Sequence, residues 1–293
     1  MSRDHDHMKA SSPTSDYALG SAEAEHQRLI RQAALLAPLT ERFLRDAGIA
    51  SGQRVLDLGS GVGDVAMLAG RIVGPSGEVV GVERDSRSIA RARARVAEAG
   101  QNHVSFTESD VVTIPVGKPF DAAVGRFILM FVPDPVAVVR VVSQAVRPGG
   151  AVAFQESSWS HFLLASAGLP LWSAAASLAR DVLERSGANV ETGFALNRIF
   201  QDAGLPAPIM KMEVTLGSDP DSSRWLYDFL STLRPQVQKQ GLSLEPLGDF
   251  DTLPLRLHAE VTASRAVVPV VGTLVGAWCH TPRSAREKET RNG

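Results

Sequence analysis

The chain has 293 residues, of which 44% are hydrophobic and 21% are charged, and this is the composition of an ordinary globular protein. Its 30 basic and 32 acidic residues give a formal net charge of -2, which argues against a large surface for nucleic acid. The single cysteine excludes an internal disulfide framework and a three-cysteine iron–sulfur cluster. Since no apolar run reaches the roughly 18 residues of a membrane span and no secretory signal opens the chain, we expect a cytoplasmic protein.

The first segments in chain order predict a tail followed by a helical leader. Residues 1–15 mix charged, His, Ser and Pro residues without periodicity, which is typical of a disordered tail. Apolar residues then recur at helical spacing over residues 21–46, and Pro38 predicts a break between two helices there. We therefore assign residues 16–50 to a helical leader.

Residues 51–156 alternate short apolar runs with amphipathic segments. This alternation is typical of a parallel sheet with helices on both faces. The expected strands cover residues 54–58, 78–83, 104–107, 120–125 and 151–156. The expected helices between them cover residues 64–72, 86–99 and 135–146. The sequence therefore predicts an α/β domain built on a Rossmann-like core.

The alternation stops after Glu156. A mostly helical stretch over residues 169–203 predicts a helical cap inserted at residues 157–206. Residues 207–283 then supply C-terminal strands and helices that complete the sheet, and residues 284–293 form a second tail. Within that part the expected strands cover 209–216 and 267–279, and the expected helices cover 222–239 and 249–263.

A glycine-rich turn follows the first predicted strand. Residues 55–64 read Val-Leu-Asp-Leu-Gly-Ser-Gly-Val-Gly-Asp, an apolar strand, a turn and the start of a helix. Glycines permit tight turning and let a ligand approach the backbone at the helix start. A dinucleotide-binding fingerprint has its third glycine three positions after the second, and this chain has Asp64 there. The motif indicates a nucleotide-like ligand and departs from the nicotinamide pattern.

Polar residues follow the next three predicted strands. Glu83 ends the second, where a carboxylate can accept hydrogen bonds from a ribose diol. Asp110 and Val111 follow the third strand, and Gly125 and Arg126 end the fourth. Because the carboxyl ends of parallel strands meet at one edge of a sheet, these residues are expected to surround one ligand.

This order of motifs resembles that of class I S-adenosylmethionine-dependent methyltransferases, over roughly residues 51–156. The resemblance implies a mostly parallel Rossmann-like methyltransferase sheet with an antiparallel last strand. In that family the glycine loop faces the aminoacid part of S-adenosylmethionine, the first acidic residue orders it through its amino group or bound water, and S-adenosylhomocysteine is the product. The positions that match as cofactor-binding are Asp57, Gly59, Ser60, Gly61, Gly63, Glu83, Arg84, Asp110, Val111, Gly125 and Arg126.

The flanking residues resemble small-molecule methyltransferases related to the quinone C-methylating enzymes. Tyr17-Ala18-Leu19-Gly20, followed by Glu25 and Arg28, is similar to their leader, in which the tyrosine closes over cofactor and substrate. The resemblance implies O- or C-methylation of a small apolar or aromatic acceptor. We expect neither nucleic acid nor a membrane as partner, and no metal, and a homodimer is one alternative for the oligomeric state.

Methyl transfer needs the nucleophile, the methyl carbon and the sulfur in line, so positioning supplies much of the rate. A general base is needed only for a weakly acidic acceptor. The catalytic candidates are His161 and Tyr17. The alternative for His161 is a structural role, and the alternative for Tyr17 is to attach the leader to the core. Arg126 has two possible roles: it binds a carboxylate of the cofactor or of an acidic acceptor, or it forms a structural ion pair. The expected substrate residues are Tyr17, Met130, Trp159, His161 and Trp172, with Phe162 and Trp225 as further aromatic candidates, although large aromatic residues in helices also pack in cores.

Other functions stay open at this point. Some methyltransferase-like proteins use the bound sulfonium electrostatically in a rearrangement, cyclisation or decarboxylation, since fold does not fix chemistry. A nicotinamide-dependent oxidoreductase would also use the glycine turn and Glu83, but Asp64 argues against it. A protein or nucleic-acid methyltransferase is disfavoured, because the sequence has neither a basic stripe nor an Asn/Asp-Pro-Pro-aromatic motif.

Overall fold

The computed structural model describes residues 23–114 and 117–283. These residues form a seven-stranded sheet with the strand order β3-β2-β1-β4-β5-β7-β6. The strands are β1 (Arg54–Leu58), β2 (Glu78–Glu83), β3 (Val104–Glu108), β4 (Phe120–Arg126), β5 (Val146–Ser158), β6 (Ile209–Gly217) and β7 (Val268–His280). Strands β1 to β5 pair in parallel, whereas β7 runs antiparallel to both β5 and β6. The predicted mostly parallel sheet with a reversed last strand is confirmed.

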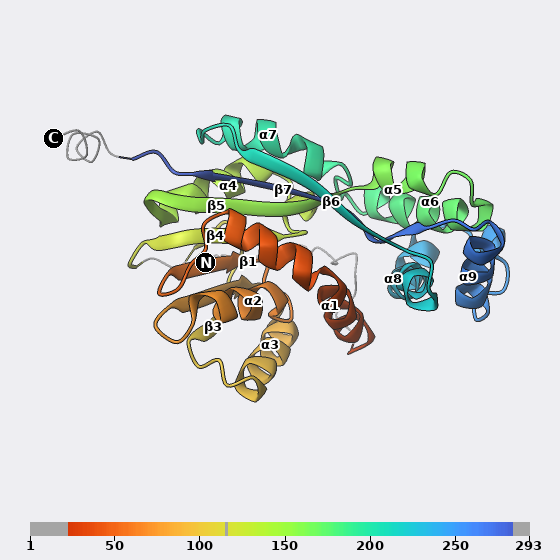
Figure 1. Cartoon of the computed structure of the whole chain (residues 1–293), viewed down its shortest axis with the longest axis horizontal. Coiled ribbons are helices and arrows are strands. Elements are labelled where there is room, and N and C mark those ends of the chain that lie inside the picture. The colour runs from red at the N-terminus through yellow and green to blue at the C-terminus, as the bar shows by residue number, and fades with distance from the viewer. Residues whose placement is uncertain (1–22, 115–116, 284–293) are drawn as a thin grey trace, which may run out of the picture.

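Helices cover both faces of this sheet (Figure 1). Alternating strand residues explain the two layers: Val55 packs with α2 (Asp64–Val73) and α3 (Ser86–Glu98) on one face. Its neighbour Leu56 packs with α4 (Pro135–Ala145) and α7 (Thr192–Asp202) on the other. Strands that are buried on both faces are characteristic of parallel sheets.

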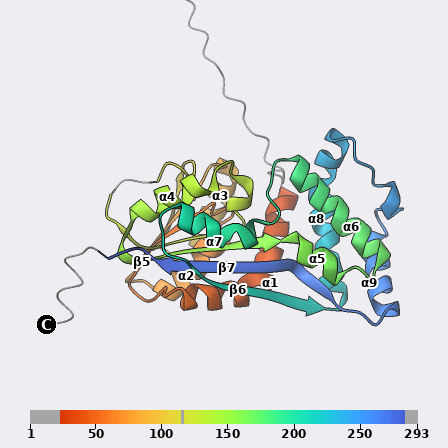
Figure 2. The ribbon, with the colours of Figure 1, turned by 90° about the horizontal axis from the view of Figure 1, so that it is seen from above.

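The remaining helices gather beyond one end of the sheet (Figure 2). They are α5 (Trp159–Ala165), α6 (Pro170–Arg185), α8 (Pro220–Lys239) and α9 (Leu253–Ala263), with the short η2 (Glu245–Leu247). The short η1 (Leu129–Phe131) instead contacts α4 and β5. The helix α1 (Glu23–Asp46) contacts both α8 and β7, so it lies between this helical layer and the sheet. Of the cap predicted at residues 157–206, α5 and α6 join the layer, while α7 packs on β5. The division into domains stays a prediction.

The largest differences from the sequence prediction concern α1 and β5. The break predicted at Pro38 is wrong, because α1 continues through this exposed proline. Leu36 before it and Phe43 after it are both buried, so packing on either side outweighs the hydrogen bond that proline removes. Strand β5 starts at Val146 rather than at residue 151, because Val146 already pairs with Phe120 before a shift in register.

Within residues 23–114 and 117–283, no helix is long and apolar enough to cross a membrane. Tyr17, the first part of the predicted leader and both predicted tails lie outside the residues that the structure describes.

The contact between α1 and the sheet at Gly276 can be tested by substitution. A Cβ atom on this β7 residue would lie 2.6 Å from the Phe43 ring. We expect Gly276→Ala to lower the free energy of unfolding by about 1–3 kcal/mol, as overpacking usually does, in urea denaturation. Gly168→Ala is the matched control, because its Cβ meets no heavy atom within 4 Å and its stability should stay near that of the wild type. Equal stability of both variants would contradict the described packing of α1.

Candidate functional site

The loop between β1 and α2 combines a packed underside with an open outer side. Gly59 and Gly61 have φ values of 62° and 51°, in the left-handed region that favours glycine. A Cβ on Gly59 would lie 2.6 Å from the side chain of Ile128. At Gly61 a Cβ would meet nothing within 4 Å, so this part of the backbone is open to a ligand.

Asp57 lies under this loop, near the end of β1. It is 1% exposed, and neither carboxylate oxygen has a hydrogen-bond partner of ordinary geometry among the described residues; the Ser60 hydroxyl has none either. Burial raises the pKa of Asp57 to about 8, and the Arg126 guanidinium and then the Ala66 amide act in the opposite direction. A buried carboxylate without donors is unfavourable, so this position fits a ligand that brings an ammonium group or other donors.

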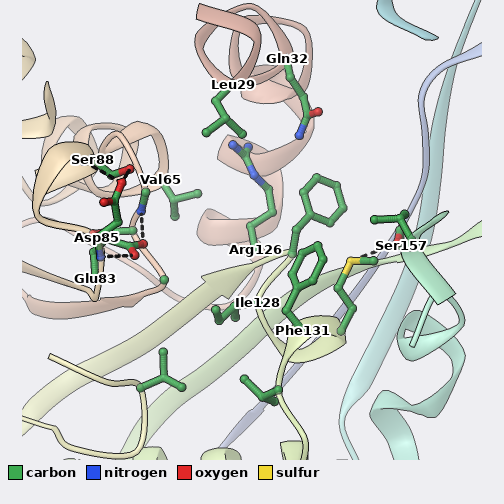
Figure 3. Close-up of a pocket in the computed structure, with 18 of the residues that line it drawn as sticks. Leu29, Gln32, Val65, Glu83, Asp85, Ser88, Arg126, Ile128, Phe131 and Ser157 are labelled. Carbon is green, nitrogen blue, oxygen red and sulfur yellow. Dashed lines mark hydrogen bonds between the residues drawn. The ribbon is translucent and has the colours of Figure 1, made fainter. Parts of the chain in front are cut away.

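Glu83 ties the end of β2 to the glycine loop (Figure 3). Its Oε2 accepts from the Gly61 N–H at 3.0 Å, and its Oε1 accepts from the N–H groups of Arg84 and Asp85 at 2.8 and 3.0 Å. A carboxylate oxygen accepts about two hydrogen bonds, so Oε2 retains capacity for a ligand hydroxyl. Asp110, beyond the end of β3, accepts from the Val112 N–H at 3.1 Å.

A cavity of about 1140 Å³ extends from the glycine loop to the helical layer. Typical small-molecule pockets hold roughly 300–1,000 Å³, so this cavity has room for a nucleotide-sized cofactor and a second molecule. The predicted cofactor residues that line it are Gly59, Ser60, Gly61, Glu83, Arg84, Asp110, Val111 and Arg126. Asp57, Gly63 and Gly125 are not among the residues that line it.

Arg126 extends from the end of β4 towards α1 (Figure 3). Its Nη1 donates to the Thr40 hydroxyl at 3.0 Å, and no ion pair to it is found among the described residues. Burial lowers the pKa of Arg126, and the carboxylates of Asp64 and Asp57 act against that shift. Asp64 itself pairs with Arg95 at 2.7 Å. The guanidinium therefore retains donors for an anionic group in the cavity.

Aromatic rings from two helices line the other end of the cavity. Trp159 and Phe162 come from α5, and Trp225 and Phe229 come from α8. Trp225 and Phe229 are stacked with centroids 5.6 Å apart, and Trp159 lies 5.9 Å from Phe229 and 5.4 Å from Phe162. We call these four residues the aromatic wall. The predicted substrate residues Trp159 and Met130 both line the cavity here.

Two other predicted substrate residues lie outside the cavity lining. Trp172 is 0% exposed and packs behind Phe162, with ring centroids 6.0 Å apart, so it belongs to the core of the helical layer. His161 is exposed and packs on Phe194 at 4.8 Å. Trp159 and Phe162 lie three positions apart on α5, so both face inward. His161 lies between them in the sequence and therefore faces outward on the helix.

The buried polar residues of α1 were identified only in part from the sequence. Arg28 is 2% exposed; its Nε and Nη2 donate to the Glu25 carboxylate at 2.7 and 2.6 Å, and its Nη1 donates to Gln32 Oε1 at 2.6 Å. His26 Nε2 lies 3.3 Å from the Ser88 hydroxyl at the start of α3. Sequence reasoning missed Gln32 and His26, which also line the cavity. The spacing of Glu25, Arg28 and Gln32 on one helical face is the signal that could have found Gln32.

Glu156 near the end of β5 is a second residue whose role the sequence did not reveal. It is 0% exposed, and its Oε1 accepts from the N–H groups of Ile128 and Leu129 at 3.0 and 2.8 Å. These bonds hold a segment that brings Ile128 and Met130 to the cavity and that contains Phe127 at a φ of 55°. Burial raises the pKa of Glu156 to about 7.

Replacing Glu156 by Gln is expected to change how stability depends on pH. The folded protein holds the Glu156 proton more tightly than the unfolded chain, so wild-type stability falls as the pH rises from 4.5 to about 7. Gln has no proton to lose, so E156Q should gain up to about 3 kcal/mol over the wild type between pH 4 and pH 8 in urea denaturation. Glu98→Gln, at an exposed position of α3, is the control. An unchanged difference between E156Q and wild type across this range would refute the assignment.

The sequence of this chain is similar to those of known methyltransferases. A family model described as a methyltransferase domain matches residues 49–204, more than half of the chain. The arsenite methyltransferase of Halobacterium salinarum is 33% identical over 111 residues, 38% of this chain and 28% of that protein. A ubiquinone/menaquinone biosynthesis C-methyltransferase of Pseudomonas putida is 32% identical over 123 residues, 41% of this chain and 48% of that protein. The chain thus spans less than half the length of these curated relatives.

Solved structures agree on the fold. The YcgJ protein from Bacillus subtilis is 12% identical, with a TM-score of 0.53 over 86% of this chain and 99% of that one. Phosphoethanolamine N-methyltransferase 2 from Haemonchus contortus, in complex with S-adenosyl-L-methionine, is 17% identical, with a TM-score of 0.52 over 84% of this chain and 53% of that one. The chain belongs to the methyltransferase-domain family, among the class I S-adenosylmethionine-dependent methyltransferases.

Proposed function

We propose that this protein transfers a methyl group from S-adenosylmethionine to an oxygen or carbon atom of a small aromatic molecule in the cytoplasm, with S-adenosylhomocysteine as the second product. The observation that carries the proposal is the cavity that joins the glycine loop above the unpartnered Asp57 to the aromatic wall. A methyl donor at one end and a flat acceptor at the other would meet within one cavity.

The cofactor, when bound, supplies an electrophilic methyl group. The residues fit its parts: Asp57 would order the ammonium group through bound water, Arg126 would hold the carboxylate, Glu83 the ribose hydroxyls and Asp110 the adenine amino group. Helix α1 lines the cavity with Arg28 and its partners, which limits the access of water to the reacting groups from that side. The chain's own contribution is to orient and enclose both molecules.

The aromatic wall favours a ring system over arsenite as acceptor. Arsenite binds thiolates, and the single cysteine, Cys279, is buried in β7 away from the cavity lining. Burial raises the pKa of this thiol to about 12, so it stays protonated at neutral pH. Two flat stacked rings, Trp225 and Phe229, instead offer an apolar surface for another ring.

The proposed function is tested in two steps with the full chain. Calorimetric titration with S-adenosylmethionine should show saturable binding, and absence of binding at millimolar cofactor would refute the proposal. Incubation with methyl-labelled cofactor and an extract of the producing cell, followed by mass spectrometry, should then yield a labelled small molecule. Binding without any labelled product would favour the alternative of a rearrangement, cyclisation or decarboxylation.

Cofactor affinity should depend on pH through Asp57. In the free protein its pKa is about 8, and a bound ammonium group would lower it, so binding below pH 8 releases a proton. Affinity should therefore rise as the pH approaches 8, and calorimetry in buffers of different ionisation enthalpy should detect the released proton. Asp57→Asn should remove this proton release and weaken binding about 10- to 100-fold at pH 8.5.

The matched control is Asp251→Asn, since Asp251 is exposed near η2 and does not line the cavity. It should reproduce the wild-type pH profile. Proton release that persists in D57N would assign the titration to another group.

A further inference from the structure

We propose that Gln32 recognises the acceptor by donating a hydrogen bond from its amide nitrogen, so that the acceptor is a planar aromatic molecule carrying an oxygen that accepts this bond, such as a carbonyl, ether or phenolate. The inference rests on the proposed function and names the substrate class of that site. It depends on the orientation of one buried amide beside the aromatic wall.

The orientation of the Gln32 amide follows from its partners. Its Oε1 receives the Arg28 Nη1 donor at 2.6 Å and the Trp225 Nε1 donor at 3.4 Å. Both of these groups can only donate, so the oxygen must face them and the nitrogen must face away. Because Arg28 is itself fixed by the Glu25 carboxylate, the whole arrangement is rigid.

The Gln32 amide nitrogen has no hydrogen-bond partner in the described part of the chain, although Gln32 is only 8% exposed and lines the cavity. Figure 3 shows this side chain and that of Arg126 pointing into the same space. Arg126 can only donate, so it cannot serve as the acceptor that the Gln32 amide nitrogen needs. Since no described side chain supplies that acceptor, a ligand oxygen is the group that would complete the arrangement.

The neighbours of Gln32 favour the acceptor molecule over the cofactor carboxylate as the source of this oxygen. Trp225, which bonds the amide oxygen, and Phe229, which lies 5.1 Å from the Arg28 guanidinium, are both in the aromatic wall. No hydrogen bond in the described part of the chain joins Gln32 to the glycine loop. A ring stacked on the wall would thus place an oxygen on its edge within reach of the amide, and this bond would select one orientation of the ring.

Two probes of the same shape test this inference without methyl transfer. 1-Acetylnaphthalene has a carbonyl oxygen that only accepts, and 1-isopropenylnaphthalene replaces it by a CH₂ group. In equilibrium dialysis against the full chain saturated with S-adenosylhomocysteine, the wild type should bind the ketone roughly three- to tenfold more tightly, the value of one hydrogen bond. Gln32→Glu keeps an acceptor for Arg28 and Trp225 but removes the donor, so the preference should disappear or reverse.

Further variants separate recognition from folding. Gln238→Glu makes the same change at an exposed position of α8 and should keep the wild-type preference. Gln32→Met, which removes the amide but keeps the side-chain length, should bind both probes equally, and it replaces Q32E if that variant melts early.

Several results would overturn the inference. Equal affinity of the wild type for both probes, no binding of either up to its solubility, or a preference that survives in both Gln32 variants would each do so. A loss of S-adenosylhomocysteine affinity in Q32E with an unchanged probe preference would assign Gln32 to the cofactor carboxylate instead. Failure of the proposed function has a different readout, because it would appear as absent cofactor binding by the wild type or as absent labelled product.

Discussion

The buried carboxyl group of Asp57 is the constraint around which the rest of the site is built. A carboxylate at 1% exposure loses its hydration, and no described residue gives it a hydrogen bond of ordinary geometry in return. The nearby Arg126 guanidinium compensates through space only, and burial disfavours that charge as well. The apolar layers on both faces of β1 must therefore supply the stability that keeps this group buried, and a cationic ligand would favour its ionised form.

The cofactor half could be predicted from the sequence because its signals are local. The apolar run of β1, the glycines behind it and Glu83 at the end of β2 occur in the order in which the parallel strands assemble. Even the replacement of the third fingerprint glycine by Asp64 has a local explanation, since this carboxylate starts α2 and pairs with Arg95. Pro38 is the opposite case, because the continuity of α1 depends on what packs against it on either side.

The acceptor half could not be predicted in the same way, because residues far apart in the chain form it. Gln32, Trp159, Phe229 and Thr273 line one cavity from α1, α5, α8 and β7. Whether an aromatic residue lines a pocket or fills a core depends on the helical phase of α5 and α6, which sequence reasoning did not determine for Trp172. The direction of the Gln32 amide follows only from its contact with Trp225, which lies 193 positions away.

The cofactor half and the acceptor half of the cavity meet at two residues whose backbone conformation is unfavourable for residues other than glycine. Phe127 and Val271 have φ values of 55° and 65°, and such conformations cost on the order of 1–3 kcal/mol each. Both residues line the cavity, and neighbours hold both in place. The Phe127 N–H donates to the Gln155 carbonyl at 2.9 Å while Glu156 fixes the next two amides, and Val271 lies at the register shift between β7 and β6, just before β7 also begins to pair with β5. Strain at this junction indicates that tertiary packing fixes the shape of the cavity against the backbone preference of these two residues. A fixed shape is needed to hold the methyl donor and the acceptor in line.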